Sequence, residues 1–165
     1  GTAVGFSALL MAEYNPIACE IVTIENYAKR IPIARANFKE AGRESQITLL
    51  EGDAQALLPS LEGSFDFIFM DAAKGQYIYF LPELVRLLKA EGILVTDNVL
   101  QDGDIIESRF AVTRRNRTIH KRMRRFLYEV MHHEEFVSSI LPIGDGLTVS
   151  SKIDRNTKKT AGESR

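Results

Sequence analysis

The chain has 165 residues, of which 45% are hydrophobic and 26% are charged, and its formal net charge is −1. These are ordinary values for a single globular domain with a proper core, and the near-neutral charge by itself indicates no class of partner. The single Cys19 excludes a disulfide framework and a multi-thiolate zinc site, and the absence of a long apolar run or a visible signal peptide favours a cytoplasmic protein.

Helix-type and strand-type patterns alternate along the first part of the chain. In order, we expect a helix at 4–14, a strand at 21–24, a helix at 26–41 that Pro32 kinks or delays, a strand at 46–50, a short helix at 54–61, a buried strand at 65–70, a helix at 77–89 and a strand around Ile93. This alternation predicts an α/β fold with a mostly parallel sheet, right-handed crossovers and helices on both faces.

The remainder of the chain has a different pattern. A long, strongly basic helical segment is expected at 105–133, followed by strands at 136–141 and 147–152. The intervening Asp145-Gly146 is a hairpin signal, so the sheet is expected to end in an antiparallel pair. The polar tail at 154–165 is expected to be disordered.

Oxygen-bearing side chains directly follow two of the expected strands. Asp71 ends the strand 65–70, and Asp97 and Asn98 end the strand around Ile93. If these strands are neighbours, the three side chains converge beyond their carboxyl ends, and such oxygen ligands suit Mg²⁺, Ca²⁺ or Mn²⁺ rather than zinc. Lys74 is close enough along the chain to act as a base or charge partner. A helix cap at Asp71 and an ordinary turn at Asp97-Asn98 are the alternative interpretations.

A second set of features indicates a nucleotide-type ligand. The turn from Gly1 to Gly5 allows close approach of the backbone to a ligand, and Glu25 ends the next strand, where an acid can accept hydrogen bonds from a ribose diol. Asp53 and Ala54 follow the strand after that, where they can contact a base. The glycine spacing fits neither the dinucleotide fingerprint nor a Walker loop.

With these motifs the chain resembles the cation-dependent O-methyltransferase family, which includes the catechol and caffeoyl-CoA O-methyltransferases. The resemblance spans Gly1 to Lys152 in the family's order and implies a Rossmann-like class I methyltransferase fold. It is closest to the bacterial branch that includes the enzyme methylating 5-hydroxyuridine to 5-methoxyuridine at the tRNA wobble position. The matching motifs are GTAVGFSALLMA, IVTIE, EGDAQALLP, FDFIFMDAAKGQY, GILVTDNVL and LPIGDGLTVS.

The resemblance implies roles for particular residues. Positions that contact S-adenosylmethionine fall on Gly1, Ser7, Glu25, Asp53, Ala54 and Asp71, with Glu25 at the ribose. The divalent cation, Mg²⁺ before Ca²⁺ or Mn²⁺, falls to Asp71, Asp97 and Asn98, and Lys74 with Asp71 falls on the catalytic positions. Relatives often pair as homodimers, and they carry helices and a central first strand ahead of the glycine turn. We therefore expect residues 1–153 to be an N-terminally incomplete methyltransferase domain with open strand edges.

The expected reaction is methyl transfer to one of two adjacent oxygens held by the cation, with Lys74 as the base. A stripe of cations on the basic helix suggests contact with tRNA, with a solvated helix face as the alternative; its members are Arg114, Arg117, Lys121 and Arg125. His120 is expected at the surface, and Tyr77 and Tyr79 either line the acceptor pocket or pack in the core. Two alternatives to the tRNA substrate stay open, a small catechol-like phenol and a chain that is an inactive fragment or binding module.

Overall fold

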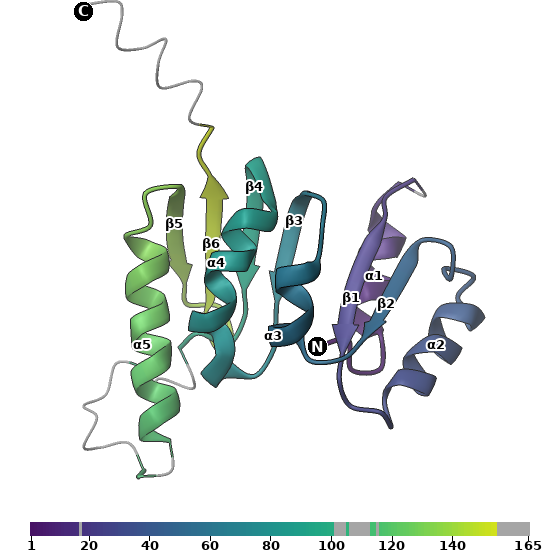
Figure 1. Ribbon diagram of the computed structural model, residues 1–165, viewed down its shortest axis with the longest axis horizontal. Helices are drawn as coiled ribbons and strands as arrows, with labels where there is room; N and C mark the ends of the chain where they lie inside the picture. The colour runs from purple at the N-terminus through teal and green to yellow at the C-terminus, as the bar shows by residue number, and fades with distance from the viewer. Residues whose placement is uncertain (17, 101–104, 106–112, 115, 155–165) are drawn as a thin grey trace, which may run out of the picture. The chain divides into compact units, whose positions relative to one another are not determined.

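The structure is a computed structural model that describes residues 1–16, 18–100, 105, 113–114 and 116–154 (Figure 1). It divides into two compact units, Gly1–Ser60 and Leu61–Arg165, and the domain expected at 1–153 spans both. The expected disordered segment at 154–165 lies outside the described residues apart from Asp154. No helix in the described part of the chain is long and apolar enough to cross a membrane.

The first unit is built on two parallel strands, β1 (Ile21–Glu25) and β2 (Ile47–Glu51), paired in register from Ile21 opposite Ile47 to Glu25 opposite Glu51. Its helices are α1 (Phe6–Tyr14), α2 (Ile31–Glu40) and α3 (Ala54–Leu57), which continues into a 3₁₀ turn, η1 (Leu58–Ser60). Helices and strands share one core, formed by Ala8, Ala12, Ala34, Phe38, Ile47 and Leu49.

The start of α2 shows how a single residue sets a boundary. The helix begins at Ile31, later than the first residue of the expected helix, and Pro32 lies in its first turn. Proline has a fixed φ and no N–H to donate, so the first turn is the part of a helix that tolerates it. The later start, one of the two outcomes expected from the sequence, is therefore the one observed.

The second unit contains a four-stranded sheet in the order β3-β4-β6-β5 (Figure 1). The strands are β3 (Phe65–Met70), β4 (Leu88–Thr96), β5 (Phe136–Leu141) and β6 (Leu147–Lys152). β3 and β4 are parallel, whereas β6 is antiparallel to both β4 and β5, which confirms the predicted terminal hairpin. Its helical segments are η2 (Lys74–Gln76), α4 (Tyr77–Leu87) and α5 (Arg117–Met131).

Two expectations for this unit are wrong. β3 is not fully buried, because it is the edge strand of its sheet and Phe67 is 46% exposed. The basic helix does not extend over the described part of 105–133: α5 begins at Arg117, and Arg114 lies ahead of it. Residues 106–112 and 115 of that expected helix lie outside the described residues.

Candidate active site

The glycine turn of the first unit is held against the end of β1. The Thr2 N–H donates to the Ile24 carbonyl at 2.9 Å, and the hydroxyls of Thr2 and Thr23 are 2.8 Å apart. Gly5 has a φ of +92°, and a Cβ there would lie 2.5 Å from the Phe38 ring. Because both the conformation and the close approach favour glycine, this turn depends on Gly5.

Glu25 connects this turn to β1. Its carboxylate accepts hydrogen bonds from the N–H groups of Ala3 at 2.7 Å, Tyr27 at 2.8 Å and Asn26 at 3.1 Å. Burial alone would raise the pKa of Glu25, but the hydrogen bonds from the N–H groups of Tyr27, Ala3 and Asn26 lower it. The buried carboxylate is therefore ionised at neutral pH, and it organises the turn, a role that sequence reasoning missed.

The other predicted cofactor positions of the first unit lie after the carboxyl end of β2 or on α1. The Gly52 N–H donates to the Glu25 carbonyl at 2.9 Å, so Asp53 follows directly from the paired strand ends. The Asp53 side chain caps α3 by accepting from the Gln55 N–H at 2.8 Å. Ala54 is the first residue of α3, and Ser7 is exposed in the first turn of α1.

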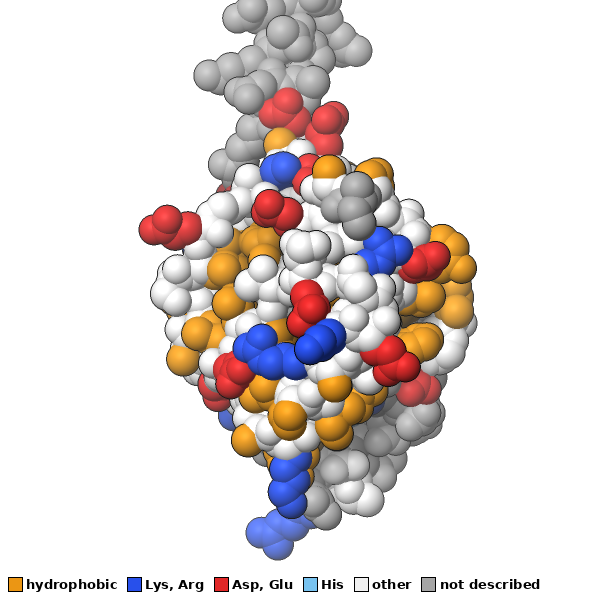
Figure 2. Space-filling model, turned by 90° about the vertical axis from the view of Figure 1, so that its right-hand side faces the viewer, with side chains coloured by type: hydrophobic (Ala, Val, Ile, Leu, Met, Phe, Trp, Pro, Cys, Tyr) orange, Lys and Arg blue, Asp and Glu red, His pale blue; other side chains and the backbone are white. Residues whose placement is uncertain are grey.

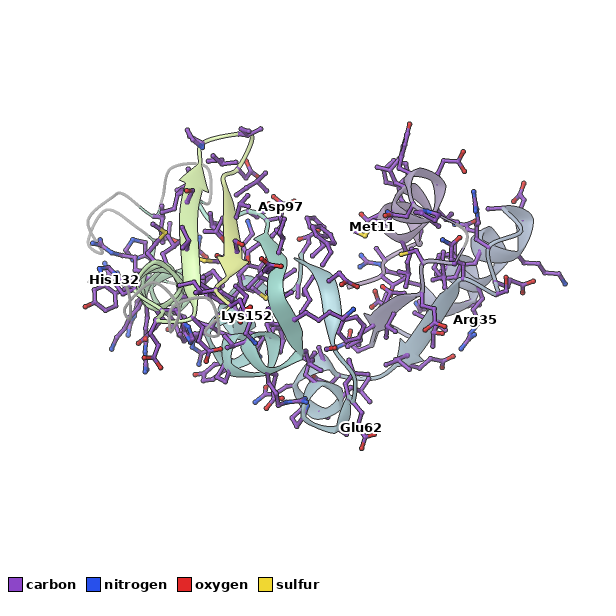
Figure 3. The ribbon with its side chains drawn as sticks, turned by 90° about the horizontal axis from the view of Figure 1, so that it is seen from above. Met11, Arg35, Glu62, Asp97, His132 and Lys152 are labelled. Carbon is purple, nitrogen blue, oxygen red and sulfur yellow. The ribbon has the colours of Figure 1, made fainter. Side chains whose placement is uncertain are left out.

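The two acids of the second unit follow neighbouring strands. Met70 of β3 is the cross-strand partner of Thr96 of β4, and the Asp97 N–H donates to the Met70 carbonyl at 3.0 Å. Asp71 and Asp97 therefore occupy adjacent positions at the carboxyl edge of the sheet; Asp97 is labelled in Figure 3. Asp97 also accepts from the Asn98 N–H at 2.6 Å, and Asn98 has the left-handed φ of +58° that asparagine tolerates.

Tyr77 lies between the two strand ends. Its hydroxyl accepts from the Ala72 N–H at 3.3 Å and donates to the Asp97 carbonyl at 3.2 Å. Burial raises the pKa of Tyr77, and the negative charges of Asp71 and Asp97 raise it further against the opposing effect of the Ala72 donor. Both carboxylates therefore act on one hydroxyl. The one sequence signal for this role is an aromatic residue a few positions after a strand-end acid, on the far side of a short turn.

Lys74 begins the short turn η2 between Asp71 and Tyr77, and it is half-buried. The opposite side of this turn is held by Arg122 of α5, whose Nη1 donates to the Gly75 carbonyl at 3.3 Å. The guanidinium of Arg122 also lies over the Tyr79 ring, 5.2 Å from its centroid. From the sequence, Arg122 was assigned no role, and these contacts were missed.

The donor chemistry of this edge fits a hard divalent cation. Asp71, Asp97 and Asn98 offer two carboxylates and a carboxamide on consecutive or adjacent backbone positions. Among the described residues there is no group of three His, Cys, Asp or Glu side chains suited to a metal. A cation at this edge would therefore need the Asn98 amide oxygen, or water, beside the two carboxylates.

The helix α5 presents different side chains to the solvent and to the core. Arg117, Lys121 and Arg125 are exposed, as expected, although Arg114 is not on the helix. His120 is only 2% exposed and lies on the buried face, so the expectation of a surface histidine is wrong. In the first unit Arg35 forms an ion pair with Glu51 at 2.6 Å, and the face shown in Figure 2 carries both acidic and basic side chains.

Each unit has a pair of parallel strands followed by acids at their carboxyl ends, and in the first unit a glycine turn lies against the end of β1. These features are those of an α/β protein of the class I methyltransferase type. The profile of the family described as O-methyltransferase matches residues 1–153. The chain belongs to this O-methyltransferase family, whose members use S-adenosylmethionine. The family predicted from the motifs is thereby confirmed, whereas the branch with the tRNA enzyme stays a prediction.

Three similar proteins indicate the range of the family. The catechol O-methyltransferase of Niastella koreensis is 34% identical over 65% of this chain and 50% of its own length. The caffeoyl-CoA O-methyltransferase of Stellaria longipes is 30% identical over 93% of this chain and 66% of its own length. The crystal structure of the SAH-bound methyltransferase PaMTH1 of Podospora anserina has a TM-score of 0.82 and 32% identity, over 93% of this chain and 70% of that one. The chain spans about half the length of the catechol O-methyltransferases that it matches.

Proposed function

We propose that this protein transfers a methyl group from S-adenosylmethionine to a hydroxyl of an acceptor that presents two adjacent oxygens, with the help of a divalent cation. The observation that carries the proposal is the placement of Asp71 and Asp97 at the ends of paired parallel strands, where both charges act on the Tyr77 hydroxyl. Two carboxylates kept close together, with an amide beside them, are a ligand set for a hard cation.

In this proposal Asp71, Asp97 and Asn98 would hold the cation. A bound cation supplies Lewis acidity, which lowers the pKa of the acceptor hydroxyl toward neutrality. Lys74 Nζ is the proposed acceptor of the hydroxyl proton. The acceptor oxygen then forms a bond to the methyl carbon as the carbon–sulfur bond breaks, and S-adenosylhomocysteine leaves. Most of the rate enhancement comes from positioning the two reactants.

The first unit supplies the proposed donor site. The ionised Glu25 carboxylate and the glycine turn that it organises support binding of the ribose, since a carboxylate accepts both hydroxyls of a diol. Asp53 and Ala54 at the end of β2 are the proposed contacts to the base, and Ser7 completes the first unit's share of the set suggested by the resemblance.

For the acceptor, we propose 5-hydroxyuridine at the tRNA wobble position, whose 5-hydroxyl and 4-carbonyl are adjacent oxygens. The exposed cations Arg117, Lys121 and Arg125 on α5 support contact with a phosphate backbone. A small catechol-like phenol is the second candidate, because similar proteins bear the names catechol and caffeoyl-CoA O-methyltransferase. A cytoplasmic homodimer is the proposed working form.

The test uses the purified full chain with S-adenosylmethionine carrying a labelled methyl group and Mg²⁺. Undermethylated tRNA and catechol are offered in parallel, and nucleosides are analysed by mass spectrometry. We expect label in 5-methoxyuridine and its loss in Asp71→Ala, with S-adenosylhomocysteine affinity largely retained. Turnover that persists in EDTA would contradict the cation-dependent mechanism, label in catechol alone would favour the second candidate, and no binding of S-adenosylhomocysteine would favour a non-catalytic chain.

A further inference from the structure

The Tyr77 hydroxyl is the contact that joins the two acid-bearing strand ends beyond the last rung of the sheet. The backbone pairing of β3 with β4 ends with the bond from the Asp97 N–H to the Met70 carbonyl. Two residues after Met70, the Ala72 N–H donates to the Tyr77 hydroxyl, which itself donates to the Asp97 carbonyl. From this geometry we infer that Tyr77 is a positioning residue that fixes the separation of the Asp71 and Asp97 carboxylates.

The hydroxyl can do this because its ring has a fixed place. Tyr77 is 0% exposed and is the first residue of α4. Its ring meets the Phe126 ring of α5 edge to face, with centroids 5.6 Å apart and planes at 75°. A buried hydroxyl that loses its partners is costly, so a ring held between two helices keeps both hydrogen bonds. The packing of α4 against α5 therefore fixes the place of the Tyr77 hydroxyl, and through its two hydrogen bonds the places of Ala72 and Asp97.

Such a tether matters for two like charges. Asp71 and Asp97 are like charges that repel each other where the pairing of β3 with β4 has ended. The segment after Asp97 is also tied to the β5–β6 loop, because the Val99 N–H donates to the Gly146 carbonyl at 3.0 Å, whereas the hydrogen bond from Ala72 to Tyr77 restrains the segment after Asp71. Each segment is held through its backbone, at the Ala72 N–H on one side and at the Asp97 carbonyl on the other, so neither hydrogen bond of the Tyr77 hydroxyl uses a carboxylate oxygen. The inference rests on the proposed cation site, and it predicts that removing one oxygen atom loosens that site without emptying the core.

The experiment compares Tyr77→Phe with Tyr79→Phe in the full chain. Phenylalanine at 77 keeps the ring and its contact with Phe126 and removes the bridge alone. Tyr79 is the matched control, because it is half exposed and its ring contact with Arg122 survives the same change. Mn²⁺ binding is measured by calorimetry and by electron paramagnetic resonance, S-adenosylhomocysteine binding by calorimetry, and the Ala72 amide by hydrogen exchange.

For Tyr77→Phe we expect Mn²⁺ affinity to fall about tenfold and the Ala72 amide to exchange about tenfold faster, with S-adenosylhomocysteine affinity unchanged. Tyr79→Phe is expected to match the wild type in all three. Equal Mn²⁺ affinity in Tyr77→Phe and wild type, or equal losses in both variants, would overturn the inference.

Two further outcomes separate this inference from the proposed function. If the wild type binds no Mn²⁺, the cation-dependent function fails, and the exchange rate of Ala72 alone decides whether Tyr77 tethers the two segments. If Tyr77→Phe does not fold, hydrogen exchange of the Ala72 amide in the wild type tests the inference. Protection of this amide from exchange supports the tether, and exchange at the rate of a free amide overturns it.

Discussion

Replacing Glu25 with glutamine tests whether a buried carboxylate organises the cofactor end of the first unit. The carboxylate accepts from three backbone N–H groups, those of Ala3, Tyr27 and Asn26, through both of its oxygens. Glutamine retains one acceptor oxygen and turns an NH₂ group toward a backbone donor. At least one charge-assisted bond is lost, so the free energy of unfolding should fall by about 1.5–3 kcal/mol.

The effect should depend on pH, because the pKa of Glu25 is lowered in the folded protein from its ordinary value of 4.5. A lowered folded pKa gives a contribution to stability that is present above 4.5 and is lost as the pH falls through 4.5 toward the folded value. The difference in stability between wild type and Glu25→Gln should therefore be full at pH 7 and shrink below pH 4.5.

Urea unfolding followed by circular dichroism between pH 3 and 7, roughly the window in which a carboxylate titrates, measures this difference. Amide exchange at Ala3 reports the local loosening of the turn. Glu44→Gln is the control, since Glu44 is exposed in the same unit and should change neither reading. A stability difference that stays constant across the pH range would refute the reasoning. Because Glu25 also belongs to the proposed donor site, S-adenosylhomocysteine affinity should fall together with the protection of Ala3.

Two further substitutions test contacts of the second unit. Lys152, labelled in Figure 3, donates from Nζ to the carbonyl of Leu88 at 2.8 Å, beside the end of α4. Lys152→Met should therefore lower the free energy of unfolding by about 2–3 kcal/mol in a urea titration. An unchanged urea midpoint would contradict this. Arg122→Ala removes the hydrogen bond to the Gly75 carbonyl in η2, the turn that begins at Lys74. Because this loosens the position of the proposed base, kcat should fall several-fold while S-adenosylhomocysteine affinity stays unchanged. Arg124→Ala, at an exposed neighbouring position, should leave turnover unchanged.

The placement of the two acids could be predicted because it follows from topology. The carboxyl ends of adjacent parallel strands share one edge, and Asp71 and Asp97 each come directly after a strand. The start of α2 could be predicted in the same way, because proline has a fixed φ and no N–H and is therefore tolerated best in the first turn of a helix. Such features are local, and a single sequence contains them.

The burial of His120 and the bridge of Tyr77 depend on packing that is not local. His120 shares the buried face of α5 with Met123, Phe126 and Val130, at spacings of three and four residues, but the surrounding arginines obscured that pattern. Tyr77 acts through Asp97, which is distant in sequence and close only once β3 and β4 pair. The division into two units could not be predicted from the sequence either, because it depends on the pairing of β1 with β2 in one sheet and of β3 with β4 in another.

The choice between the two acceptors depends on α5, because the acid pair serves any molecule with two adjacent oxygens. If tRNA is the substrate, Lys121 and Arg125 neutralise phosphates, and replacing both with alanine should reduce the slope of log affinity against log salt by about 1.4–1.8. Turnover of catechol by the same variant should not change. A double replacement of Lys29 and Lys39, both exposed in the first unit, is the control for net charge.

Filter binding of tRNA at several salt concentrations gives the slope, and the labelled-methyl assay with catechol gives the turnover. If the α5 variant and the control lower tRNA affinity equally, net charge is responsible and α5 is not the contact surface. If the α5 variant leaves the slope unchanged, these cations form a solvated helix face, and the phenol becomes the better acceptor. The salt slope discriminates because each lost phosphate contact removes a fixed number of released counterions, whereas packing around the acid pair does not change it.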